Sequence, residues 1–198
     1  IAIIEEKDAT EDEKNINEIF TGVLCARTDL LKEGLLEIKD DNAAGEFYLT
    51  DIVSIMSNKG IKINTYVASN DEVKGANSHR ELAELEGIFR EMKAQDILDM
   101  GITVSDPSRL DVRGEVTSGK DCSIDVNVIL EGNVELGDNV SIGPNCVIKN
   151  TSIESNSKID AFCHIDGAKV GEGCVVGPYA RLREGSKIEA AAKVGNFV

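Results

Sequence analysis

The sequence predicts an α/β part, then a long helix, then a parallel β-helix built from hexapeptide repeats. In residues 1–77, short apolar runs alternate with segments of helical periodicity, which is typical of α/β proteins. From residue 78, apolar residues recur three or four places apart over about twenty residues, which predicts one amphipathic helix. From residue 124 to the end, an aliphatic residue recurs at nearly every sixth position, which predicts the β-helix.

Within residues 1–77, three apolar segments are expected to form strands and two periodic segments to form helices. The expected core strands are residues 1–4 and 19–26, and residues 61–67 alternate as an edge strand does. The expected helices are residues 30–38 and 47–57, whose apolar residues follow a helical spacing.

The long amphipathic helix is expected to begin at Asn77 or Ser78 and to end at Gly101, with Pro107 beyond it. Ser78 followed three residues later by Glu81 has the form of a capping box. A helix in this place would be a rigid arm between two domains. Its apolar stripe, opposite a solvated face of Glu and Lys, consists of Leu82, Leu85, Ile88, Phe89, Met92, Ile97 and Leu98.

The period of six fits neither a helix, which repeats near 3.6, nor a strand, which repeats at two. It fits a chain that turns a corner every six residues, so that three hexads close one triangular coil and coils stack at the strand spacing of about 4.8 Å. The residue four places after each aliphatic one, such as Val128 or Ser152, is expected to pack beside it, with Lys169 as the exception. The aliphatic residues, expected to fill the interior, are Ile124, Leu130, Leu136, Ile142, Ile148, Ile153, Ile159, Ile165, Val170, Val176, Leu182, Ile188 and Val194.

Composition and charge narrow the class of protein. The net charge is −15, from 36 acidic and 21 basic residues, which disfavours binding to nucleic acid or to an anionic membrane. No apolar run is long enough for a membrane span and no signal peptide opens the chain, so we expect a soluble cytoplasmic protein. The start at Ile1 without methionine and the stop at Val198 without a cap lead us to expect a segment of a longer protein.

The cysteines and histidines do not predict a reactive site. No pair of cysteines has the spacing of a metal site, and Cys122, Cys146, Cys163 and Cys174 fall at the small position of the hexads. They are expected to be buried and reduced, as small hydrophobes. His79 and His164 are expected to be structural or solvated, and no phosphate loop or nucleophile–base pair is visible.

Short motifs that occur in order along the chain closely resemble a family of bacterial bifunctional enzymes, the N-acetylglucosamine-1-phosphate uridyltransferase/glucosamine-1-phosphate acetyltransferases. The resemblance covers essentially the whole chain. The motifs are Glu5-x-Lys7-Asp8-Ala9-Thr10, Thr21-Gly22, Asn42-Ala43-Ala44-Gly45-Glu46-Phe47-Tyr48-Leu49-Thr50-Asp51, Val73-x-Gly75-x-Asn77, Gly177-Pro178-Tyr179-Ala180-Arg181-Leu182-Arg183 and Val194-Gly195-Asn196-Phe197-Val198.

The resemblance implies a two-step route to UDP-N-acetylglucosamine, a precursor of peptidoglycan and lipopolysaccharide. Residues 101–198 would begin a left-handed β-helix domain that acetylates glucosamine-1-phosphate with acetyl-CoA. Residues 1–79 would be the C-terminal part of a Rossmann-like nucleotidyltransferase domain, which couples N-acetylglucosamine-1-phosphate to UTP with Mg²⁺ and releases pyrophosphate. Residues 80–100 would be the linker helix. Members of the family are homotrimers with acetyl-CoA bound between subunits.

The resemblance also assigns roles to individual residues. Glu5 is expected to accept hydrogen bonds from the amino sugar, and Asn77 to ligate Mg²⁺ and contact the nucleotide. Arg183 is expected to bind the sugar phosphate, because a planar guanidinium suits a phosphate. The respective alternatives are a solvated acid, a helix cap and a surface arginine. No catalytic residue is expected in this chain, because the general-base histidine and its lysine partner would lie beyond Val198.

Two positions depart from the family pattern. Phe20 occupies the place of an asparagine that binds the sugar nucleotide, and a phenyl ring cannot replace its hydrogen bonds. A lost buried polar contact costs about 1–3 kcal/mol, so Phe20 would rearrange sugar binding or weaken uridyl transfer. Glu184 replaces a common proline after Arg183, and its negative charge would weaken phosphate binding modestly.

The leading hypothesis is therefore a segment of this bifunctional enzyme that by itself catalyses neither reaction. One alternative is another sugar-1-phosphate nucleotidyltransferase whose hexapeptide tail only drives oligomerisation. The other is a non-catalytic scaffold in which both parts mediate assembly.

Overall fold

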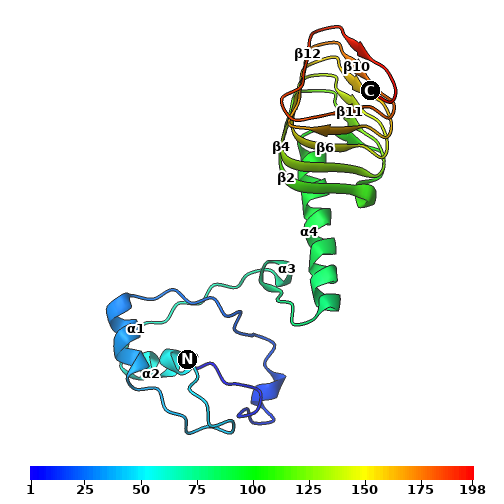
Figure 1. The fold of residues 1–198 in the computed structure, drawn as a ribbon. Coiled ribbons are helices and arrows are strands. Elements are labelled where there is room, and N and C mark those ends of the chain that lie inside the picture. The colour runs from blue at the N-terminus through cyan, green and yellow to red at the C-terminus, as the bar shows by residue number, and fades with distance from the viewer. The chain divides into compact units, whose positions relative to one another are not determined.

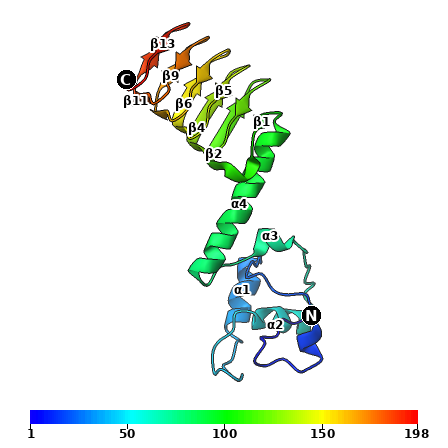
Figure 2. The ribbon, with the colours of Figure 1, turned by 90° about the vertical axis from the view of Figure 1, so that its right-hand side faces the viewer.

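The computed structural model describes residues 1–198, and the chain divides into two compact units, Ile1–Lys74 and Gly75–Val198. Each unit is described by itself below (Figures 1 and 2). No helix is both long enough and apolar enough to cross a membrane.

The first unit is built around two packed helices. These are α1 (Thr28–Leu35) and α2 (Asp51–Asn58). A short 3₁₀ turn, η1 (Glu13–Asn15), precedes them, and a short helix, α3 (Asn70–Val73), follows them. Gly34 on α1 is buried, and a side chain there would meet Met56 and Ile52 of α2 at 3.1–3.3 Å. The glycine therefore lets the two helices approach closely. These helices lie within or beside the segments that the periodicity predicted.

The three strands expected in this unit do not form, and that prediction was wrong for this structure. Residues 1–4, 19–26 and 61–67 have no strand assignment, and Ile4, Ile19 and Val23 are 45%, 76% and 80% exposed. A strand satisfies its N–H and C=O groups only through a paired neighbour, and none of these segments pairs with another. The apolar runs indicated strand propensity but could not supply the partners.

The second unit begins with the predicted long helix, α4 (His79–Asp99). The Ser78 side chain accepts a hydrogen bond from the Glu81 N–H, as predicted, at 3.3 Å. The Glu81 carboxylate reaches one residue further back than a capping box requires, and accepts from the Asn77 N–H at 2.6 Å. One of the four free N–H groups of the first turn and the N–H just before the helix thus have side-chain acceptors.

Helix α4 closes the first coil of the β-helix with its C-terminal half only. Ala94 and Ile97 are each 2% exposed and join the same core cluster as Leu110 and Val112 of the first long strand. The N-terminal half leaves its apolar stripe largely open, since Leu82, Phe89 and Met92 are exposed. The helical period predicted the apolar stripe correctly, but only the part of it that packs against the β-helix is buried.

The coils that follow form a parallel β-helix of about five turns, stacked on α4 (Figure 1). A 3₁₀ turn, η2 (Pro107–Arg109), leads into the coils. One sheet contains β1 (Thr103–Val104), β3 (Ser123–Ile124), β5 (Ser141–Ile142), β7 (Lys158–Ile159), β10 (Val175–Val176) and β13 (Lys193–Val194). The other contains β2 (Leu110–Ser118), β4 (Val128–Leu136), β6 (Val147–Ile153), β8 (His164–Asp166), β9 (Lys169–Val170), β11 (Arg181–Leu182) and β12 (Lys187–Ile188).

The register confirms that three hexads make one coil. Ile124 pairs with Ile142, eighteen residues on, and Ile142 pairs with Ile159, seventeen residues on, across a short step. The aliphatic positions from Ile124 to Leu182 are 0–6% exposed, while Ile188 and Val194 are half-buried against the same core. The sequence period therefore identified the interior correctly.

The small inward position shifts at both five-residue steps. At the first step the buried residue is Thr151 rather than the expected Ser152, and at the second, where Lys169 was the expected exception, it is Ala168, with exposures of 2% and 1%. Each of these hexads is one residue shorter, at its corner. The inward position therefore comes three residues after the aliphatic one instead of four. The buried hydroxyl of Thr151 donates to the Lys149 carbonyl at 2.6 Å, which satisfies it.

One corner of the β-helix changes its chemistry from amide to aromatic along the stack. In the first coils Asn127 and Asn145 occupy it, and the Asn127 amide donates to the Asn145 side-chain oxygen at 2.9 Å. In the later coils Phe162, Tyr179 and Phe197 occupy it, with ring centroids 4.9 and 5.4 Å apart. All five have φ between 58° and 63°, which asparagine tolerates and aromatic residues rarely adopt. We call the three rings the aromatic ladder.

Replacing the central ring tests what offsets this backbone cost. Tyr179→Asn should lose two ring stacks, each about 0.5–1.5 kcal/mol, but keep a residue suited to positive φ. Tyr179→Val should be less stable still, because a β-branched residue is strained there. Urea unfolding followed by circular dichroism measures both. The explanation would be contradicted if Tyr179→Val lowered the free energy of unfolding no more than Tyr179→Asn does.

Candidate functional site

The structure places the four predicted site residues in two different units. Glu5 and Phe20 lie in the first unit, whereas Asn77 and Arg183 lie in the second. Within the second unit, Asn77 precedes α4 and Arg183 follows β11, so they lie at opposite ends of it (Figures 1 and 2). The structure therefore does not join Asn77 and Arg183 into one site, in keeping with the two separate reactions that the resemblance implied.

In the first unit, Glu5 and Phe20 are both open to solvent. The Thr50 hydroxyl donates to the Glu5 carboxylate at 3.4 Å, and both residues belong to motifs that carried the resemblance. Phe20 is 38% exposed and lies in an irregular segment. Glu5 is thus free to accept further hydrogen bonds, while the Phe20 ring has no hydrogen-bonding group to offer.

Asn77 by itself does not make a metal site. Its main-chain N–H is held by Glu81, which leaves its side chain exposed and available. No three His, Cys, Asp or Glu side chains of this chain gather as they would around a metal ion. The residues present therefore supply at most one oxygen ligand from Asn77, too few for Mg²⁺, and we derive no step through the metal.

Arg183 belongs to a column of charged residues of alternating sign on the outer face of the β-helix. Arg113 pairs in register with Glu131, Glu131 with Lys149, and Lys149 with Asp166. Ile165 pairs with Leu182, so Arg183 continues the column above Asp166. We call Arg113, Glu131, Lys149, Asp166 and Arg183 the charged column.

The lower members of the charged column neutralise one another. Lys149 lies 2.9 Å from the Glu131 carboxylate. Their hydrogen bond and opposite charges raise the pKa of Lys149, with a further contribution from the charge of Asp166, and lower the pKa of Glu131. Arg113 pairs with Asp111 at 2.5 Å. Arg183 makes no ion pair, so its guanidinium remains available to an anion.

Glu184, the acid beside Arg183, lies over Gly167 of the preceding coil. A methyl group added at Gly167, in the preceding coil, would meet the Glu184 Cγ atom at 2.8 Å, which shows that the stem of Glu184 rests over this glycine. Gly167 also accepts a hydrogen bond from the Gly185 N–H at 2.9 Å. Glu184 makes no ion pair with Arg183, so its effect on a phosphate is confined to longer-range repulsion.

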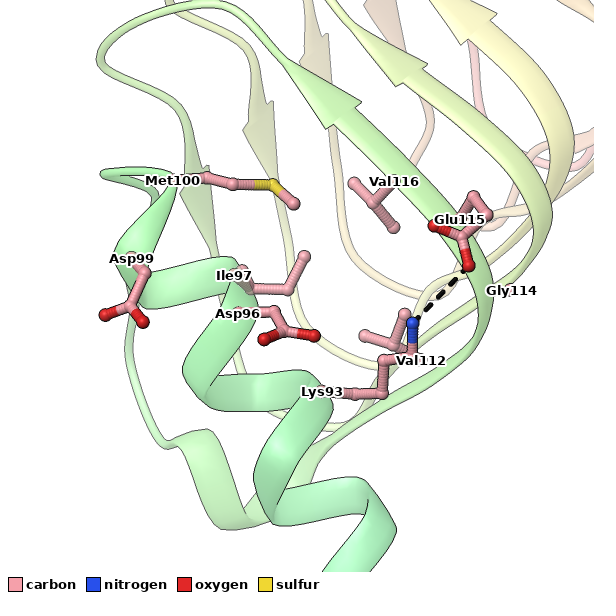
Figure 3. Close-up of a pocket in the computed structure, with 9 residues that line it drawn as sticks. All are labelled: Lys93, Asp96, Ile97, Asp99, Met100, Val112, Gly114, Glu115 and Val116. Atoms are coloured by element: carbon pink, nitrogen blue, oxygen red, sulfur yellow. Dashed lines mark hydrogen bonds and ion pairs between the residues drawn. The ribbon is translucent and has the colours of Figure 1, made fainter. Parts of the chain in front are cut away.

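A cavity that the sequence did not predict lies at the closed base of the β-helix (Figure 3). It measures about 310 Å³ and lies between the end of α4 and β2, with Ile97, Val112 and Val116 as its apolar lining. Lys93 reaches across it to Glu115 at 3.5 Å. Asp96 and Asp99 also line it, but no serine, cysteine or histidine that could act as a nucleophile or be paired with a base does.

The buried cysteines confirm the structural interpretation. All five cysteines are free thiols, and only Cys25 is exposed. Cys146 and Cys163 occupy the same inward position in consecutive coils, and Cys146 also donates to the Asp160 carbonyl at 3.1 Å. The hydrogen bond to Cys163 and the burial raise the pKa of the Cys146 thiol, so it stays neutral. These thiols serve packing rather than catalysis.

Comparisons with known proteins match the chain along its whole length. A protein-family profile described as "GMPPB C-terminal domain" matches residues 112–198. A bifunctional protein GlmU of Idiomarina loihiensis is 47% identical over 197 residues, which cover 99% of this chain and 43% of that protein. The GlmU proteins of Methylococcus capsulatus and Paraburkholderia phytofirmans are 46% and 49% identical, and cover 100% and 99% of the chain. The chain spans less than half the length of these relatives, 43–44%.

The ion pair in the charged column provides a test by pH. Lys149→Met should raise the pKa of Glu131 toward its ordinary value of 4.5. Because the folded pKa lies below the unfolded one, the pair stabilises the fold above about pH 4.5, and this contribution disappears as the pH falls through the folded pKa. An NMR titration of the Glu131 carboxyl measures this, with Lys187→Met as a control on another face. An unchanged midpoint in Lys149→Met would contradict the pairing.

Proposed function

The chain is homologous along its whole length to a segment of the bifunctional GlmU proteins, and from this premise we propose that it is part of an enzyme making UDP-N-acetylglucosamine. The full-length protein would transfer acetyl from acetyl-CoA to glucosamine-1-phosphate. It would then transfer uridylyl from UTP to N-acetylglucosamine-1-phosphate and release pyrophosphate. The observation that carries this proposal is an identity of 46–49% over 99–100% of the chain, which includes both units.

We assign the two reactions to the two ends of the chain. Residues 1–79 would belong to the Rossmann-like uridyltransferase domain, and residues 101–198 to the acetyltransferase domain, a left-handed β-helix. Residues 80–100 would be the linker helix. The packing of Ala94 and Ile97 into the first coil supports a rigid attachment of that helix to the acetyltransferase domain.

In the acetyltransferase site, Arg183 would hold the phosphate of glucosamine-1-phosphate. A guanidinium can donate two parallel hydrogen bonds to phosphate oxygens, and this fixes the position of the sugar. The charged column beneath Arg183 already balances its own charges, so the positive charge of Arg183 is available to the ligand. The phosphate would be bound at this end of the column and the amine presented for acetyl transfer.

In the uridyltransferase site, Glu5 would accept hydrogen bonds from the sugar and Asn77 would contact the nucleotide. Asn77 would offer a single oxygen ligand to Mg²⁺, and the other ligands would have to come from residues outside this set. Phe20 replaces a hydrogen-bonding residue of this site, and we propose that uridyl transfer is slower than acetyl transfer for that reason.

We propose a cytoplasmic homotrimer associated through the β-helix, with acetyl-CoA bound between subunits. A net charge of −15 supports a protein that binds neither nucleic acid nor a membrane surface. The substrates are themselves anions, so their binding requires local cations such as Arg183 on an otherwise acidic molecule.

Arg183→Gln in the full-length protein should raise KM for glucosamine-1-phosphate about tenfold or more, because a charge-assisted hydrogen bond is lost. Arg183→Lys should have a KM between those of wild type and Arg183→Gln, because lysine keeps the positive charge but cannot donate two parallel hydrogen bonds. A coupled assay of acetyl transfer measures both, with uridyl transfer as the internal control. Unchanged KM in Arg183→Gln would refute the assignment.

Asn77→Ala should slow the coupling of UTP to N-acetylglucosamine-1-phosphate while leaving acetyl transfer intact. The hydrogen bond of Asn77 to Glu81 uses the main-chain N–H, so alanine keeps it. Ser78→Ala is the matched control, because it removes the helix cap at a cost of about 1 kcal/mol without touching the proposed ligand. Equal activities of the two variants would mean that Asn77 serves only the helix.

A further inference from the structure

Arg181 is a second exposed arginine on the same face of the same strand as Arg183. The residue between them, Leu182, is 6% exposed and points into the core. Because successive side chains of a strand alternate, Arg181 and Arg183 both point outward. Their Cα atoms are separated by two residues of extended chain, roughly 6.5 Å.

Arg181 also has no partner within the protein. It makes no ion pair, and no ring lies beneath its guanidinium in a cation–π contact. In the coils, Arg113, Lys149 and Lys158 each have an acidic partner, whereas Arg181, Arg183 and Lys187 have none. With 36 acidic residues against 21 basic ones, an unpaired guanidinium is not explained by a shortage of acids.

The three residues directly beneath Arg181 in its column carry no carboxylate. Arg181 pairs in register with His164, His164 with Val147, and Val147 with Ile129, and the acid Asp111 comes only below Ile129. On the corner side of this column the aromatic ladder contributes no charge, and on the other side Asp166 lies in the column of Arg183. No acid of its own column therefore lies next to Arg181.

Two guanidinium groups at this separation fit one phosphate monoester. The phosphate carries nearly two negative charges and three terminal oxygens, so a single arginine leaves one oxygen and much of the charge unmatched. Side chains that converge from neighbouring outward positions can each donate two N–H groups to it. A singly charged anion would be matched by one of these arginines alone.

We propose that Arg181 is a second phosphate-binding residue, which together with Arg183 grips the phosphate of the amino-sugar substrate from two sides. This inference rests on the proposed acetyltransferase function for the identity of the ligand. The site itself is inferred from β11, where Arg181 and Arg183 both point outward. The role of Arg181 is to bind and to select a dianionic phosphate over uncharged sugars.

The test uses the full-length protein and three variants. Arg181→Gln should raise KM for glucosamine-1-phosphate about tenfold and leave KM for acetyl-CoA unchanged. Arg181→Lys should recover part of this loss. Lys187→Gln, which removes an exposed positive charge from β12, is the matched control and should behave as wild type. Circular dichroism verifies that Arg181→Gln is folded.

A second measurement separates this inference from the proposed function. The affinity for inorganic phosphate, followed in every variant by NMR shifts of the Arg183 side chain, should fall in Arg181→Gln and not in Lys187→Gln. If wild type acetylates glucosamine-1-phosphate but Arg181→Gln matches Lys187→Gln, the inference is overturned and the function stands. If wild type does not acetylate it, the function fails. The phosphate affinities alone then decide whether the two arginines form a site.

Discussion

The second unit depends on backbone hydrogen bonds between consecutive coils. Each coil donates to the next at N–O distances near 2.9 Å, for example from the Ile129 N–H to the Cys146 carbonyl and from the Val147 N–H to the Cys163 carbonyl. Since these bonds are parallel and in register, a residue lies directly above the one 17 or 18 places earlier. Every column of side chains follows from this constraint.

The columns explain how an acidic surface can still present a site for an anion. Where acids and bases alternate, as from Arg113 to Asp166, the charges cancel along the stack. Where a column holds no acid over three coils, as from Ile129 to His164, a cation above it has no carboxylate directly beneath it. Arg181 and Arg183 lie side by side on these two columns, so local charge depends on register as well as on net composition.

The first unit lacks such a constraint, and its structure departs further from the prediction. Its packed centre is the contact of Gly34 with Ile52 and Met56, which joins two short helices. Elsewhere the apolar segments stay exposed, because no neighbouring strand takes up their backbone groups. Sequence periodicity found the helices, whose hydrogen bonds are internal, and failed for the strands, whose hydrogen bonds are not.

By itself, the sequence determined the β-helix and its interior, because one aliphatic residue at each sixth place suffices to define the coil. It also singled out Glu5, Phe20, Asn77 and Arg183, through motifs rather than through any visible pattern of chemistry. Only the tertiary structure decided that Thr151 and Ala168 face inward at the short steps, since the position of a lost residue within a corner depends on stacking. Only stacking, too, shows that Arg181 lies beside Arg183 and above three residues without a carboxylate, because those residues are 17 or more places away along the chain.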